Sequence, residues 1–174
     1  MNAAEKIKTA CERSIKAIKL KPSLGQGTGV SKVTITNGLT CEIEEGKWRF
    51  KADMPEGAGG NSEGPTPGVY GRAALGSCLA IGYMMKAAQA DIPVTSLQVE
   101  VQADYDDGAM FGTRHDVPAG YTEVRYIVTI ESDAPEDKIR QMLDEADLRS
   151  PYLDVFSRPQ KCVRELKIVT PQQH

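Results

Sequence analysis

The first part of the chain shows one helical pattern, which three strand patterns follow. Ile7, Cys11 and Ile15 recur every four residues, which predicts an amphipathic helix over 3–20. Pro22 ends this pattern because proline cannot continue a helix. The following residues alternate between apolar and polar in three short runs. We therefore expect an antiparallel meander of three strands after the helix.

The hairpin signal of the meander is the pair Asn37-Gly38, because both positions tolerate the positive φ of a tight turn. Trp48 and Phe50 mark one side of the third run. A stretch rich in glycine and proline follows over 53–68, and it is too irregular for a strand or a helix. We interpret it as a long functional loop within one domain.

The second part of the chain begins with an apolar helix. Residues 69–90 carry only two charges, Arg72 and Lys86, so this helix is expected to be buried. Strand patterns then surround Val99 and Val128, and two helices and a final strand follow. The first helix is expected to start at Pro135 and the second at Ser150-Pro151. The strand is expected over 161–170, with Leu166 and Ile168 on its inner side.

This order of elements predicts an α+β fold with antiparallel pairing and helices on one face of the sheet. The 174 residues suit one domain. We divide the chain into an N-terminal amphipathic helix and linker, 1–27, and a main domain, 28–170.

Composition and charge narrow the function classes. No apolar run reaches the length of about 20 residues that a membrane span needs. The start of the chain lacks the apolar core of a secretion signal, so we expect a cytoplasmic protein. The net charge is −3, with no basic stripe that would favour nucleic acid. Residues 1–21 are nonetheless basic, so the first helix either presents a solvated face or docks to an anionic partner.

The four cysteines are Cys11, Cys41, Cys78 and Cys162. None forms a Cys-x-x-Cys pair, and no set of residues has the spacing of metal ligands, so no metal or cofactor is predicted. Cys78 stands out because Gly-Ser-Cys places its sulfur among small side chains, soon after the long loop. It is either a packed core residue or a reactive thiol, and a reactive thiolate would need a nearby cation.

Several segments resemble the OsmC/Ohr family, the osmotically inducible and organic hydroperoxide resistance proteins. The resemblance runs from about Thr28 to Val169 and is carried by Asp53-Met-Pro, Gly64-Pro-Thr-Pro67, Ala73-Ala-Leu-Gly-Ser-Cys-Leu-Ala80, Ile92-Pro93 and Gly120-Tyr121. It implies an OsmC-like fold with an antiparallel sheet and a central buried helix. It also implies an intertwined homodimer with two active sites at the subunit interface.

The same resemblance implies a reaction. The cysteine at the position of Cys78 attacks an organic hydroperoxide and becomes a sulfenic acid. A second cysteine then forms a disulfide, and an external thiol reductant resets the enzyme. An arginine keeps the thiolate ionised, and Arg49 and Arg72 are the candidates for that role.

The sequence departs from the family pattern at two positions that the implied reaction uses. Ser150 stands where the second cysteine is expected, and a hydroxyl cannot form a disulfide. The resemblance also implies a glutamate on the turn before the helix, where Gly68 or Val69 stands in this chain, so Glu56 or Glu63 would have to replace it. Cys162 does not match the position of the second cysteine.

Three hypotheses follow. The first is a one-cysteine thiol peroxidase that reduces organic hydroperoxides through Cys78. The second is a protein that has lost this activity and binds a small apolar ligand in the inherited pocket. The third is an interaction protein that docks a partner through 3–20. The sequence identifies neither the peroxide nor the reductant.

Overall fold

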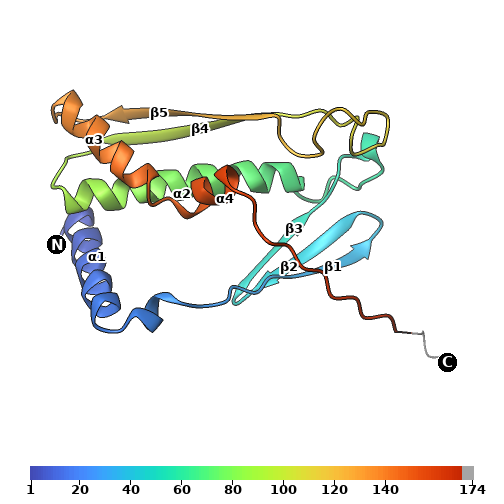
Figure 1. Cartoon of the computed structure of the whole chain (residues 1–174), viewed down its shortest axis with the longest axis horizontal. Helices are drawn as coiled ribbons and strands as arrows, with labels where there is room; N and C mark the ends of the chain where they lie inside the picture. The colour runs from blue at the N-terminus through green and yellow to red at the C-terminus, as the bar shows by residue number, and fades with distance from the viewer. Residues whose placement is uncertain (170–174) are drawn as a thin grey trace.

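The structure is a computed structural model that describes residues 1–169. A long helix runs through its middle, a two-stranded sheet covers one side of that helix, and a separate three-stranded sheet lies beyond one end (Figure 1). The elements are α1 Ala3–Leu20, η1 Pro22–Gly25, β1 Lys32–Asn37, β2 Thr40–Glu45, β3 Trp48–Ala52, η2 Glu56–Ala58, α2 Pro67–Gln89, β4 Ser96–Asp104, β5 Glu123–Glu131, α3 Glu136–Asp147 and α4 Pro151–Ser157.

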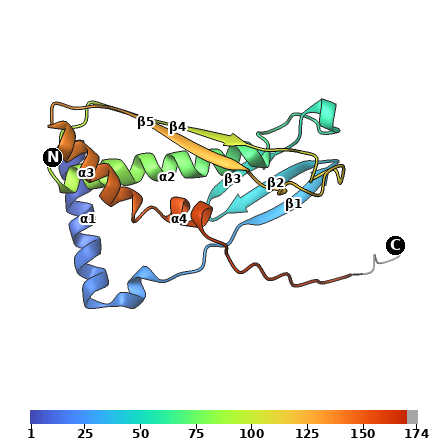
Figure 2. The same cartoon turned by 45° about the horizontal axis from the view of Figure 1, so that its top comes forward.

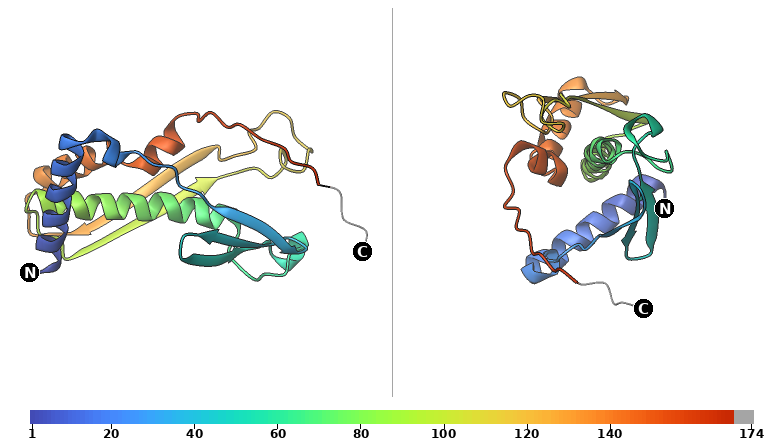
Figure 3. Two further views of the ribbon diagram at one scale, coloured as in Figure 1. Left: turned by 90° about the horizontal axis from the view of Figure 1, so that it is seen from below. Right: turned by 90° about the vertical axis from the view of Figure 1, so that its right-hand side faces the viewer.

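The central helix α2 organises the core. Leu75, Leu79 and Tyr83 are almost fully buried and lie at helical spacing on the face that meets β4, β5 and α3. Gly76 lets the sheet approach closely, since a Cβ at this position would lie 3.2 Å from a methyl carbon of Val101. The right-hand view of Figure 3 looks along α2 and shows what surrounds it: the β4–β5 sheet on one side, α3 and α4 on another, and α1 on a third.

Helix α1 crosses the C-terminal end of α2. Asn2 and Glu5 form a capping box that satisfies the first backbone N–H groups of α1. Cys11 is buried at the contact between the two helices, and Lys8 pairs with Asp91 just beyond α2, with Nζ 2.6 Å from Oδ2. The second half of α1 extends away from α2, which leaves Ile18 44% exposed (Figure 2).

The meander forms as the sequence predicts, and its register is antiparallel. Val33, Ile43 and Phe50 are cross-strand neighbours along β1, β2 and β3. Their face remains uncovered in the single chain, since Val33 is 57% exposed and Phe50 is 41% exposed. Antiparallel pairing is therefore confirmed, but it is divided between two sheets instead of one.

The expected final strand over 161–170 is wrong for the described residues. Residues 159–169 have no regular secondary structure and run away from the body of the molecule (Figure 2). Leu166 and Ile168 are 73% and 84% exposed, so they have no inner side. A strand needs a neighbouring strand for its backbone hydrogen bonds, and the described chain supplies none to this segment. Thr170 lies outside the described residues.

The predicted division between 1–27 and 28–170 and the cytoplasmic location stay predictions. Among residues 1–169, no helix is both long and apolar enough to cross a bilayer.

Candidate active site

Cys78 lies near the middle of α2, where it is half-buried. Helix α2 begins at Pro67, which suits the first helical position because its fixed φ is already helical and its missing N–H is not needed there. Cys78 follows more than two turns later, too far along for the helix dipole to favour a thiolate strongly. Its chemistry therefore depends on side chains from other elements.

The side chain of Ser150 lies within hydrogen-bonding distance of Cys78. Its Oγ lies 3.6 Å from the Cys78 Sγ, although the two residues are 72 positions apart in sequence. Ser150 caps the N-terminus of α4, where its Oγ accepts a hydrogen bond from the Leu153 N–H at 3.4 Å. It is only 7% exposed. The position expected to carry a second cysteine therefore does lie beside Cys78, and it presents a buried hydroxyl.

A cavity of about 470 Å³ opens from this pair. Ile81, Gly82 and Met85 continue along α2 from Cys78 and form one wall, and Ala146 and Pro151 lie opposite. This lining is mostly apolar. A substrate with a small apolar body could approach the sulfur through it.

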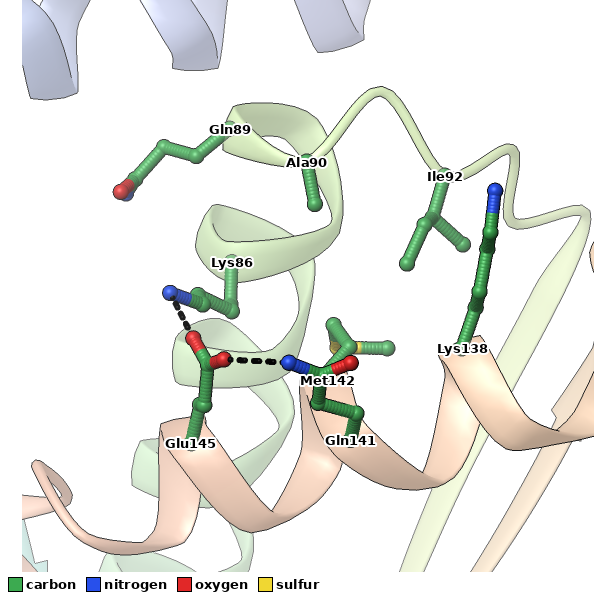
Figure 4. A pocket seen from close by; sticks show the side chains of 8 residues that line it. All are labelled: Lys86, Gln89, Ala90, Ile92, Lys138, Gln141, Met142 and Glu145. Carbon is green, nitrogen blue, oxygen red and sulfur yellow. Dashed lines mark hydrogen bonds and ion pairs between the residues drawn. The ribbon is translucent and has the colours of Figure 1, made fainter.

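The far end of the cavity is polar. Lys86 and Glu145 form an ion pair with Nζ 2.5 Å from Oε2, and the Gln141 amide donates to the other carboxylate oxygen at 3.1 Å (Figure 4). The hydrogen bond from Lys86 is the main reason that the pKa of Glu145 is lowered. The pair also lines a neighbouring cavity of about 450 Å³ between α2 and α3, together with Lys138. This ion pair thus lines both the apolar cavity and its more polar neighbour.

A carboxylate clamp lies behind the site and fixes the end of α3. The Tyr83 hydroxyl donates to Asp147 Oδ1 at 2.6 Å, and the Tyr126 hydroxyl donates to Oδ2 at 2.8 Å. Burial, followed by these hydrogen bonds, raises the pKa of both tyrosines, that of Tyr126 to about 12. Both therefore stay protonated donors near neutral pH. The Ser150 N–H in turn donates to the Asp147 carbonyl at 3.1 Å.

The structure places the two candidate arginines elsewhere in the single chain. The Arg72 guanidinium donates to the Tyr121 hydroxyl at 3.3 Å, and Tyr121 stacks on Phe156 of α4. Arg49 lies on β3 and pairs with Glu44, with Nε 3.2 Å from Oε1. Neither arginine lines the Cys78 cavity or forms a hydrogen bond with Cys78 within residues 1–169.

The other residues considered from sequence are also placed away from Cys78. Glu63 pairs with Lys51 of β3, at 2.6 Å between Nζ and Oε2, and Glu56 begins the short helix η2. Both belong to the loop that precedes α2. Cys162 is exposed in the C-terminal tail. None of the three lines the Cys78 cavity.

The loop owes its shape to Asp53, a residue for which no structural role was predicted from the sequence. Its buried carboxylate accepts from the Thr40 hydroxyl at 2.8 Å and from the N–H groups of Met54, Asn61 and Glu63. Burial raises the pKa of Asp53, but these hydrogen bonds outweigh it and hold the pKa below its ordinary value. The Asp53-Met-Pro segment thus ties the loop to the meander.

Arg149 is a residue that sequence reasoning missed. It lines the same cavity as Cys78 and lies one position before Ser150. No local pattern marks it, because its position depends on how α3 packs on α2. Among residues 1–169, no group of three or more histidines, cysteines and acids could hold a metal ion.

The comparisons with known proteins agree with the fold. A sequence model described as "OsmC-like protein" matches residues 59–163, which is more than half of the chain and includes both Cys78 and Ser150. The chain therefore belongs to the OsmC-like protein family. No curated protein matches the chain at a significant level.

Solved structures share the fold at low sequence identity. An OsmC-like protein from Mycoplasma pneumoniae is 15% identical with a TM-score of 0.65, covering 75% of this chain and 88% of its own. An organic hydroperoxide resistance protein from Elizabethkingia anophelis is 17% identical with a TM-score of 0.56, covering 76% and 89%. A third, the organic hydroperoxide resistance protein OsmC from Legionella pneumophila, is 14% identical with a TM-score of 0.53, covering 75% and 90%. These similarities establish the OsmC-like fold.

Proposed function

We propose that the chain is a thiol peroxidase of the one-cysteine type that reduces organic hydroperoxides through Cys78. The observation that carries this proposal is the position of the Cys78 sulfur, half-exposed at a mostly apolar cavity and 3.6 Å from the buried hydroxyl of Ser150. An apolar entrance favours a peroxide with an organic body over hydrogen peroxide. Two of the structural neighbours are named organic hydroperoxide resistance proteins, which supports the same substrate class.

The reaction begins with the Cys78 thiolate. Its sulfur attacks the terminal oxygen of R–O–O–H, so that an S–O bond forms as the O–O bond breaks. The sulfur is oxidised by two electrons to the sulfenic acid, and the peroxide leaves as an alkoxide that takes a proton to become ROH. An external thiol then attacks the sulfenic sulfur, which releases water and leaves a mixed disulfide. A second thiol restores Cys78 and leaves with the first as a disulfide.

The proposal includes a homodimer, and the exposed surface of the single chain supports it. The chain exposes 13390 Å². A compact monomer of this length exposes about 8,300 Å² by the scaling of surface with mass, so roughly 5,000 Å² remains in excess. Obligate homodimers bury on the order of 2,000 to 5,000 Å² in total, which is about 1,000 to 2,500 Å² per chain, so a second copy would cover part of this excess.

The uncovered surfaces have the composition of an interface. Ile81 and Met85, one turn apart on α2, are exposed apolar side chains, and the apolar face of the meander is uncovered as well. A second copy would cover both. It would also bring its own meander, with Arg49, toward Cys78, so in the proposed dimer Arg49 and Arg72 remain candidates for the cation that stabilises the thiolate.

The test is turnover with purified protein. Cumene hydroperoxide consumption in the presence of excess dithiothreitol is followed for the wild type, C78S and C162S. We expect C78S to abolish protein-dependent consumption and C162S to leave it unchanged. Loss of activity in C162S alone would contradict the proposal, because Cys162 would then be the reacting thiol.

A second candidate function rests on the cavity alone. Its volume of about 470 Å³ and apolar wall also fit a protein that binds a small apolar ligand without thiol chemistry. The same C78S variant separates the two, because ligand binding measured by fluorescence of an apolar probe would survive that substitution. Binding in C78S together with wild-type protein that consumes no peroxide would favour this second function.

A further inference from the structure

We propose that Ser150 is a positioning residue whose hydroxyl donates a hydrogen bond to the Cys78 thiolate and then keeps the sulfenic acid available to an external thiol. This inference rests on the proposed peroxidase function and adds a role for the residue that replaces the second cysteine.

The direction of the hydrogen bond follows from what each atom can do. The Ser150 Oγ already accepts from the Leu153 N–H at 3.4 Å, and the single proton of the hydroxyl remains to be donated. The Cys78 sulfur lies 3.6 Å away, within hydrogen-bonding range for sulfur. A thiolate can only accept, so the hydroxyl must be the donor once Cys78 is ionised. Hydrogen bonds to ionised groups are stronger than those between neutral groups.

The hydroxyl is held in place before any substrate arrives. The Ser150 N–H donates to the Asp147 carbonyl at 3.1 Å, and the Asp147 side chain is fixed by Tyr83 of α2 and Tyr126 of β5. Ser150 is also 93% buried, since only 7% of it is exposed, so little water competes for the sulfur on that side. A donor oriented in advance by its surroundings stabilises developing charge without reorganisation.

The same geometry explains how oxidation is resolved. Serine offers no sulfur, so the sulfenic acid on Cys78 has no partner at the position where a second cysteine would attack. The hydroxyl at 3.6 Å can instead hydrogen-bond to the sulfenic oxygen. The intermediate then persists until an external thiol enters the cavity and attacks the sulfur, with release of water.

The experiment compares variants at one position by two measurements. The first is the rate of Cys78 alkylation by iodoacetamide across a pH series, resolved by peptide mass spectrometry. The second is the lifetime of the sulfenic acid, trapped by dimedone at intervals after one equivalent of cumene hydroperoxide. S150A and S150G both remove the hydroxyl, and S150G keeps a residue that helix N-caps tolerate. S150T retains the hydroxyl, and S157A is a matched control on the same helix.

We expect S150A and S150G to slow alkylation at neutral pH by about tenfold, the effect of losing one hydrogen bond to a charged group, and to move the profile to higher pH. S150T and S157A should behave as the wild type. S150C should form a disulfide with Cys78 on oxidation, seen as the loss of two hydrogens from the intact mass.

Wild-type alkylation profiles and sulfenic acid lifetimes in both S150A and S150G would overturn the inference, as would an S150C protein that forms no disulfide with Cys78 when oxidised by diamide. The proposed function fails separately, if cumene hydroperoxide oxidises wild-type Cys78 no faster than a free thiol. The alkylation series and the diamide reaction use no peroxide, so they decide the role of Ser150 in either case.

Discussion

The carboxylate clamp at Asp147 links the stability of the fold to the position of Ser150, and the D147N variant tests this link. In the wild type, each carboxylate oxygen accepts one hydrogen bond, from Tyr83 at 2.6 Å and from Tyr126 at 2.8 Å. Asparagine has the same shape but only one accepting oxygen. One tyrosine hydroxyl therefore loses its acceptor at a part-buried position.

The magnitude follows from this count. Leaving one buried polar group unsatisfied costs about 1–3 kcal/mol, and the remaining bond is weakened because the acceptor is no longer charged. We expect D147N to lower the free energy of unfolding by about 2 kcal/mol. Removing the orphaned hydroxyl should recover part of this loss, so D147N combined with Y126F should cost less than the sum of the two single variants.

The assay is urea unfolding followed by circular dichroism, with D144N as the matched control. Asp144 is exposed on the same helix, one turn before Asp147, and its side chain contributes no hydrogen bond to the clamp. We expect D144N to unfold like the wild type. Equal unfolding free energies for D147N and D144N, or strict additivity with Y126F, would refute the clamp as described.

Four further outcomes follow from the contacts described. L79A should lower the free energy of unfolding by about 2–5 kcal/mol in thermal denaturation, because Leu79 is 1% exposed in the core; a loss below about 1 kcal/mol would contradict that packing. Asp53 has a lowered pKa, so the stability that it contributes is present above about pH 4 and is lost as the pH falls through the pKa of Asp53 in the folded protein. Hydrogen exchange in the loop should show this loss in the wild type and not in D53N. Tyr126 has a raised pKa of about 12, so its contribution to the free energy of unfolding is complete below about pH 10 and is lost toward pH 12. The unfolding free energy of Y126F should therefore depend less steeply on alkaline pH than that of the wild type. An unchanged slope would exclude Tyr126 as the source of this pH dependence. Deleting residues 1–20 removes the Lys8–Asp91 ion pair and the packing of Cys11, so it should lower the melting temperature. The sedimentation behaviour should stay that of the proposed dimer, and a change from dimer to monomer on deletion would give the N-terminal helix a role in association.

Local chemistry accounts for most of the elements that the sequence predicted. The helix over 3–20 is confirmed residue for residue because its apolar spacing agrees with its capping box and with the break at Pro22. The hairpin is confirmed, but its turn lies one residue later than the Asn37-Gly38 pair predicts. Asn37 still belongs to β1 and pairs with Thr40, so the turn is Gly38-Leu39, with the positive φ at Gly38. Helix α2 starts two residues earlier than expected, since Pro67 belongs to the first turn and not to the loop.

The contacts that depend on distant parts of the chain were harder to predict. The separation of 72 positions between Cys78 and Ser150 leaves no local signal, and the family pattern alone suggested that these positions meet. No motif marks Arg149, and the Asp53-Met-Pro segment gives no sign of the hydrogen bonds that Asp53 accepts. The packing of α3 on α2 and the folding of the loop give these two residues their neighbours. The strand expected over 161–170 failed for a related reason, since alternation predicts a strand but cannot provide its partner.

The measurement that tests the central claim most directly is the rate at which Cys78 is oxidised by cumene hydroperoxide compared with hydrogen peroxide. Intact-mass spectrometry after rapid quenching would give both rates, and peptide mapping would assign the added oxygen or mixed disulfide to Cys78. The account predicts oxidation at Cys78 that is faster with the organic peroxide by at least about tenfold, which corresponds to about 1.4 kcal/mol of preferential transition-state binding in the apolar cavity. Rates equal to those of a free thiol with both peroxides would contradict it and would mean that this site binds ligands without thiol chemistry.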